Sequence, residues 1–95
     1  MHNYFELKFD NKMVTKLAGN PLGKQVFKEQ LLGKVNYENN ITIIFPDRID
    51  TIASSFIQGF FEDIVKNIGI SGIEDKVSII SSIPDLKNLI IRNLL

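Results

Sequence analysis

Residues 52–68 show the pattern that most constrains the fold of this chain. Apolar residues occur there in pairs, each followed by a pair of polar or small residues: Ile52/Ala53, Phe56/Ile57, Phe60/Phe61 and Ile64/Val65, and then a last Ile68. This spacing predicts an α-helix of about four turns with one wide buried stripe. It also favours burial of the three phenylalanines over an exposed aromatic patch for stacking nucleic-acid bases.

Three other segments have the patterns of β-strands. Residues 41–45 form a nearly continuous apolar, β-branched run, which is typical of a central strand covered on both faces. Residues 77–80 form a second short apolar run. The alternation of Phe5, Leu7 and Phe9 with charged residues predicts an N-terminal strand, and residues 13–17 could form a hairpin with it.

Asn20 and Pro21 favour the start of a helix, with Asn20 as its N-cap, and Gly33 suits its end. The stretch from Gly19 to Gln25 also has a weak likeness to a phosphate-binding loop. It is one residue short of the usual spacing, and Gln25 replaces the magnesium-binding Ser or Thr. A helix start is therefore the better interpretation.

The end of the chain is predicted to contain a further loop and helix. Gly69 and Gly72 should bound a loop, and Ser81 or Ser82 should cap a last helix with Asp85 in its first turn. Strands and helices thus alternate along residues 1–95. We expect a single α/β domain with a mixed, largely parallel sheet of about four strands and about three helices.

The composition excludes several kinds of site. Eleven basic and eleven acidic residues argue against a protein that coats nucleic acid or an anionic membrane. The absence of cysteine excludes disulfides and thiolate chemistry, and the single histidine, His2, disfavours a Ser-His-Asp triad and histidine-rich metal sites. No apolar stretch is long enough for a membrane span or a signal peptide. We expect a cytoplasmic, non-enzymatic protein without a metal or cofactor.

The segment ITIIFPDRIDTIASSFIQGFF, residues 41–61, resembles the core of a STAS-type domain, as in bacterial anti-sigma-factor antagonists. The shared features are an apolar strand, an acidic turn and a serine-bearing helix start. A small STAS-like family of unknown function is a closer match, through Ser55-Phe56, Gly59-Phe60-Phe61 and the upstream Gly23-Lys24. Two residues depart from the STAS pattern, because Ala53 stands before Ser54 and Phe56 follows Ser55.

This resemblance implies a STAS-like fold and a regulatory module of bacterial signalling. The implied partner is a histidine-kinase-like ATPase or another signalling protein, docked through residues 46–58. Phosphorylation of Ser54 or Ser55 could switch the interaction, because a phosphate there would face the free amides and positive dipole of a helix N-terminus. The remaining candidate partner-binding residues are Asp47, Arg48, Asp50 and Gln58.

Other interpretations of these residues remain open. Ser55 and Gln58 match a capping box, which would make the serine a structural residue. Asp47 and Asp50 could belong to a solvated turn or hold a metal. The chain could instead be a homo-oligomeric interaction protein without a switch, or a small enzyme that uses Ser and Asp side chains.

Overall fold

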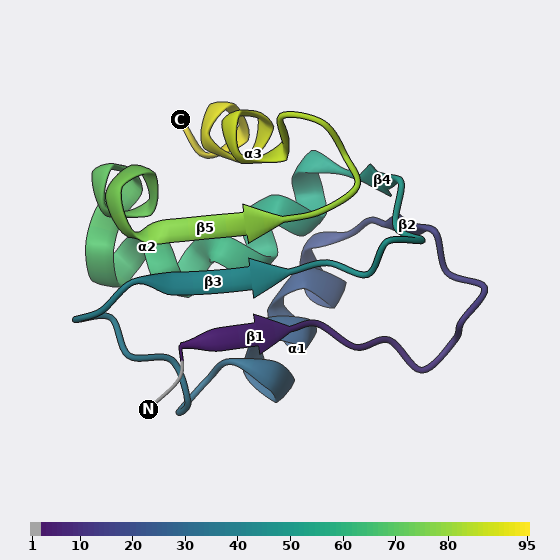
Figure 1. Ribbon diagram of the computed structural model, residues 1–95, viewed down its shortest axis with the longest axis horizontal. Coiled ribbons are helices and arrows are strands. Elements are labelled where there is room, and N and C mark those ends of the chain that lie inside the picture. Colours follow the sequence, from purple (N-terminus) through teal and green to yellow (C-terminus); the bar gives the residue numbers. More distant parts are fainter. Residues whose placement is uncertain (1–2) are drawn as a thin grey trace.

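The structure, a computed structural model, describes residues 3–95, so His2 and the predictions about it lie outside the described residues. The described residues form an α/β fold in which strands and helices alternate (Figure 1). In chain order the elements are β1 (Tyr4–Glu6), β2 (Lys16–Leu17), α1 (Asn20–Gln30), β3 (Ile41–Ile44), β4 (Thr51–Ile52), α2 (Ser54–Lys76), β5 (Val77–Ile80) and α3 (Leu86–Leu94).

The strands form two separate sheets, and every strand pair is parallel. β3 lies between β1 and β5 in a three-stranded sheet, while β2 pairs with β4. The predicted N-terminal hairpin is therefore wrong. Pairing of β1 with β3 aligns Phe5 with the buried Ile43, whereas β2 is only two residues long. The sequence predicts one mixed sheet of about four strands, whereas the described residues form five strands in two parallel sheets.

The three-stranded sheet has two unlike faces. The covered face packs against helices, and its residues are Phe5, Ile41, Ile43, Val77 and Ile79. The open face consists of their neighbours along the strands: Tyr4, Glu6, Thr42, Ile44, Ser78 and Ile80. Figure 1 shows α1 and α2 behind the sheet, with α3 beyond β5. The prediction that the central strand is covered on both faces is therefore wrong.

The helices α1 and α2 approach each other closely where two glycines meet the opposite backbone. A Cβ atom at Gly59 would collide with the carbonyl of Asn20, and one at Gly23 would collide with the carbonyl of Phe56. Phe56, Phe60 and Phe61 of α2 are buried, which confirms their predicted place in the core. Because these glycines have no side chains, α2 packs closely against α1, and the aromatic rings of α2 fill the adjacent core.

α2 is longer than the sequence predicts. Residues 70–76 continue as helix after a break at Gly69, whose φ of 70° suits glycine. The predicted loop between Gly69 and Gly72 is therefore a kink within one long element. β5 begins at Val77, as predicted. The Val77 amide also donates a hydrogen bond to the carbonyl of Ile73, so the strand follows the last turn of the helix directly.

The starts of the two flanking helices also differ from expectation. Asn20 is the first residue of α1 rather than its cap, and the preceding Gly19 has a φ of 100° that favours glycine. α3 begins at Leu86 after Asp85, and neither Ser81 nor Ser82 caps it. The Ser81 hydroxyl instead accepts a hydrogen bond from the nearby Ile83 amide. Among the helices of residues 3–95, none is long and apolar enough to cross a membrane.

Candidate functional site

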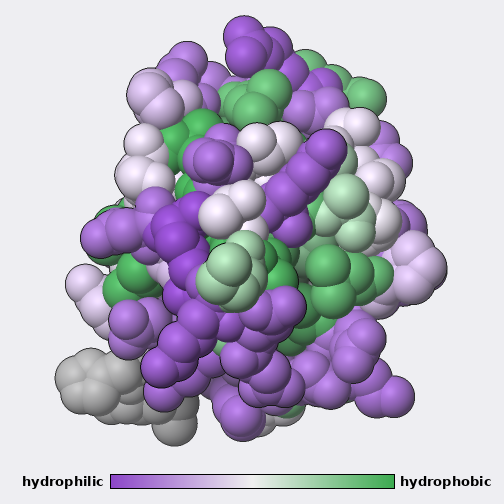
Figure 2. Space-filling model, turned by 90° about the vertical axis from the view of Figure 1, so that its right-hand side faces the viewer, coloured by the Kyte–Doolittle hydropathy of each residue, from purple (hydrophilic) through white to green (hydrophobic). Residues whose placement is uncertain are grey.

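The candidate site lies where the strands of the main sheet end. Parallel strands end at one edge of a sheet, and the helices that return between them begin at the same edge. In Figure 1 this edge is on the right, and Figure 2 faces it, showing mainly hydrophilic surface with smaller apolar areas. Residues 46–58 comprise the turn after β3, β4 and the start of α2. They are the residues that the sequence predicts to dock a partner, and we refer to them as the docking surface.

The turn after β3 has a fixed backbone and exposed acidic side chains. The Ile49 amide closes it by donating to the carbonyl of Pro46 at 3.0 Å, and the Ile49 side chain is buried. The Ser82 hydroxyl donates to the carbonyl of Asp47 at 2.8 Å. Asp47 and Asp50 are exposed, and the Asp50 carboxylate accepts a hydrogen bond from the Thr51 hydroxyl. Both carboxylates are therefore presented on a rigid support.

Arg48 points into the fold from the same turn. Its guanidinium donates to the carbonyl of Phe9 at 3.3 Å, and its Nε atom is buried without a hydrogen-bond partner among the described residues. The side chain thus ties the turn to the segment that follows β1. Of the three charged residues of the turn, Arg48 is the least accessible to a partner.

Ser54 and Ser55 occupy different environments although they are adjacent. The Ser55 hydroxyl accepts a hydrogen bond of 3.0 Å from the amide of Gly19, which joins the starts of α1 and α2. Ser54, the first residue of α2, is exposed, and its hydroxyl makes no hydrogen bond to another described residue. A kinase could therefore reach Ser54, whereas modification of Ser55 would break a contact within the fold.

The capping-box interpretation of Ser55 and Gln58 is wrong. Ala53 is the N-cap of α2, and no side chain caps the helix. Gln58 instead donates to the carbonyl of Asn93 in α3 at 3.4 Å. The first turn of α2 also lacks an acidic residue, so its amides and the positive end of its dipole are not neutralised from within the helix.

The structure also argues against a phosphate-binding loop near Gly23. That glycine is buried inside α1, where its backbone faces α2. Lys24 is directed to Glu62, with a distance of 3.4 Å between their charged atoms. The segment therefore lacks the open loop of amides that such a motif needs.

Two contacts that support the docking surface had no signal in the sequence. The carbonyl of Thr15 accepts from the Asp50 amide at 2.8 Å, and the carbonyl of Leu17 accepts from Ala53 at 2.8 Å. Both come from the short β2 region, so the β2–β4 pair fixes the turn to the helix start. Their partners lie more than thirty positions away, and local patterns do not indicate such pairings.

A separate polar cluster surrounds Tyr37. Its hydroxyl donates to the Asp63 carboxylate at 3.2 Å, and its backbone carbonyl accepts from Lys76. Burial raises the pKa of Tyr37 well above its ordinary value, and the neighbouring Asp63 charge adds to the rise. The phenol therefore stays protonated and tethers the segment before β3 to α2.

Residues 3–95 contain no group of three or more His, Asp or Glu side chains placed to hold a metal. Comparisons of this chain with models of protein families, with curated proteins and with solved structures give no match.

Proposed function

We propose that this protein is a non-enzymatic, STAS-like regulatory module that docks a signalling protein through residues 46–58. The partner class implied by the resemblance is a histidine-kinase-like ATPase, and phosphorylation of Ser54 would weaken docking. The observation that carries this proposal is the contrast at the start of α2. Ser54 is exposed beside a rigid acidic turn, while Ser55 is bonded within the fold.

The physical basis of the switch is electrostatic. Phosphorylation adds nearly two negative charges and three strong acceptor oxygens at one point. On Ser54 these charges would lie near the free amides of α2 and on the same surface as Asp47 and Asp50. A partner that approaches this surface would then meet a changed charge pattern while the core stays intact.

The test combines three serine variants with affinity purification from the native host and mass spectrometry. We expect Ser54→Asp to lose a specific ATPase partner that the wild-type protein retains. Ser71→Asp is the matched control, because Ser71 is also an exposed serine of α2 but lies outside the docking surface. Ser55→Ala should lower thermal stability, since it removes the hydroxyl that accepts the hydrogen bond from the Gly19 amide. Equal partner recovery with Ser54→Asp and Ser71→Asp would contradict the proposal.

A homo-oligomeric interaction protein is the second candidate, favoured by the open face of the sheet. Tyr4 and Ile80 on that face are 61% and 48% exposed. Light scattering coupled to size-exclusion chromatography distinguishes the two. A dimer that dissociates on Ile80→Asp but not on Ser54→Asp would favour this second function.

A further inference from the structure

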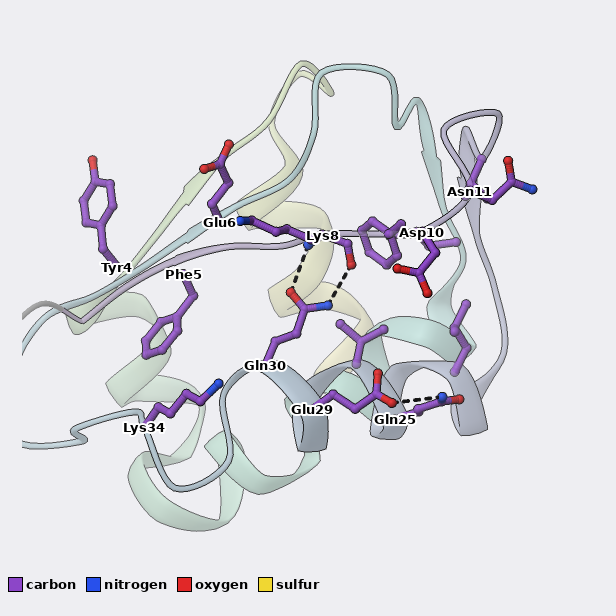
Figure 3. A pocket seen from close by; sticks show the side chains of 15 residues that line it. Tyr4, Phe5, Glu6, Lys8, Asp10, Asn11, Gln25, Glu29, Gln30 and Lys34 are labelled. Atoms are coloured by element: carbon purple, nitrogen blue, oxygen red, sulfur yellow. Dashed lines mark hydrogen bonds between the residues drawn. The ribbon is translucent and has the colours of Figure 1, made fainter.

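A groove runs between α1 and the chain segment that contains β1 and the residues after it (Figure 3). It is open to solvent and has a volume of about 780 Å³. Its apolar lining comes from Phe5 and Phe9 on one side and from Leu22 and Val26 of α1 on the other. Residues 46–58 do not contribute to it, so the groove is distinct from the docking surface.

One wall of the groove is the free edge of the main sheet. Within residues 3–95, β1 pairs only with β3, through bonds such as Leu7 N–H to the carbonyl of Ile44 and Thr42 N–H to the carbonyl of Asn3. Because alternate residues of a strand bond the same neighbour, the backbone groups of Tyr4, Glu6 and Lys8 point the other way. These groups are a template for a further strand.

Gln30 already occupies part of that template. Its side-chain amide nitrogen donates to the carbonyl of Lys8 at 2.8 Å, and its amide oxygen accepts from the Lys8 N–H at 2.9 Å. Figure 3 shows this pair of bonds crossing the groove. A carboxamide in this position makes the two bonds that a peptide unit of an added strand would make. Among the described residues, Tyr4 and Glu6 have no such partner on their outward side.

The charges are divided between the two ends of the groove. Lys34 lies at the Phe5 end, and Lys8 extends toward Glu6 there, as Figure 3 shows. Figure 3 shows the carboxylates of Asp10 and Glu29 at the other end, away from Lys34 and from the side-chain nitrogen of Lys8. Neither carboxylate makes an ion pair within residues 3–95. A ligand that fits this end has an apolar part, which packs on the apolar lining, and a cationic group, which pairs with the two carboxylates.

We propose that this groove binds an extended peptide segment of another protein, which adds as a strand to β1 and displaces the Gln30 amide from Lys8. Apolar side chains of the segment pack on Phe5, Phe9 and Val26, and a basic side chain pairs with Asp10 and Glu29. Backbone bonds supply general affinity for extended chains, while the groove and its acidic end select the sequence.

The probe is a fluorescein-labelled heptapeptide, Arg-Thr-Val-Thr-Val-Thr-Arg, with blocked ends, and its binding is measured by fluorescence anisotropy. In an extended chain its arginines and valines point to the same face, because a threonine separates each from the next. An arginine at each end brings a guanidinium to the acidic end in either chain direction. We expect saturable binding that is about tenfold tighter than that of Glu-Thr-Val-Thr-Val-Thr-Glu, and that weakens with salt. Equal binding of the two peptides would overturn the proposal.

Backbone N-methylation tests whether the peptide adds as a strand. Two versions of the probe are methylated on alternate nitrogens, so that one version loses the donors that face β1 and the other loses those that face away. We expect one version to lose binding and the other to keep it. Loss or retention of binding by both versions would contradict strand addition. In the wild-type protein, amide hydrogen exchange at Tyr4 and Glu6 should slow when the unmodified probe binds.

Two pairs of variants locate the site in the full chain. Glu29→Lys should weaken binding about tenfold. Asp75→Lys makes the same change of charge at an exposed residue outside the groove and should leave binding unchanged. Gln30→Ala should tighten binding, because the peptide no longer competes with the amide for Lys8. Gln58→Ala removes the same carboxamide at an exposed residue outside the groove and should leave binding unchanged. Circular dichroism confirms that each variant is folded, and weaker binding by Gln30→Ala would contradict displacement.

Discussion

The covered and open faces of the main sheet are built from neighbouring residues of the same three strands. Ile43 on the covered face is fully buried, whereas Ile80 on the open face is 48% exposed. Parallel sheets usually have helices on both faces. Here α1 and α2 lie on one face and α3 lies beyond β5, packed on α2 through contacts such as Gln58 with Asn93. The buried residues of this sheet thus lie at one helix–sheet interface, and we expect substitutions there to cost more stability than substitutions on the open face.

The largest expected effect is loss of a core side chain on the covered face. Ile43→Ala should lower the free energy of unfolding by about 3 kcal/mol, because it removes buried methyl groups and leaves a cavity. Ile80→Ala makes the same chemical change on the open face and should cost less than about 1 kcal/mol. Urea denaturation followed by circular dichroism measures both. Equal losses would show that the open face is covered in solution, for example by self-association.

An intermediate effect is expected where α1 and α2 meet behind the covered face. Gly59→Ala should destabilise the protein by about 2 kcal/mol although alanine favours helices, because its Cβ would collide with the Asn20 carbonyl. Ser71→Ala, an exposed change in the same helix, is the control and should be nearly neutral. Thermal unfolding of both variants is the measurement. A neutral Gly59→Ala would mean that the two helices separate at little cost.

The smallest effect is expected for a polar change on the open face. Ile80→Thr keeps a β-branched residue in β5 and should alter the free energy of unfolding by no more than about 0.5 kcal/mol. Ile43→Thr would bury a hydroxyl and should destabilise strongly. Chemical denaturation gives the loss of unfolding free energy for each variant. The ratio of the two losses measures how much more the covered face contributes to stability than the open face.

The elements predicted correctly are those with enough residues to show a period. β5 begins and ends where the apolar run does, and the apolar pairs of residues 56–65 mark the buried stripe of α2. β4 was missed because two residues show no alternation. The apolar run of β3 suggested burial on both sides, but composition alone does not reveal that Ile44 and Ile80 share a face without a helix.

The candidate site was only partly predictable for a related reason. The position of Asp47, Asp50 and Ser54 at the strand and helix ends followed from local patterns. The partners of Ser55 and Arg48 did not, because Gly19 and Phe9 are 36 and 39 positions away along the chain. These contacts decide which side chains are bonded within the fold and which remain accessible. They depend on how the two sheets come together.

The parallel pairing of every strand has a consequence for how the chain folds. Tyr4 pairs with Thr42, Lys16 with Thr51 and Ile41 with Val77, so every ladder joins residues more than thirty positions apart. Such pairings require the closure of long loops before the contacts form, and they slow folding. During synthesis on the ribosome, β3 cannot pair with β5 until residues 77–80 have been made. Until then one edge of the central strand stays unpaired and is a template for pairing with other chains.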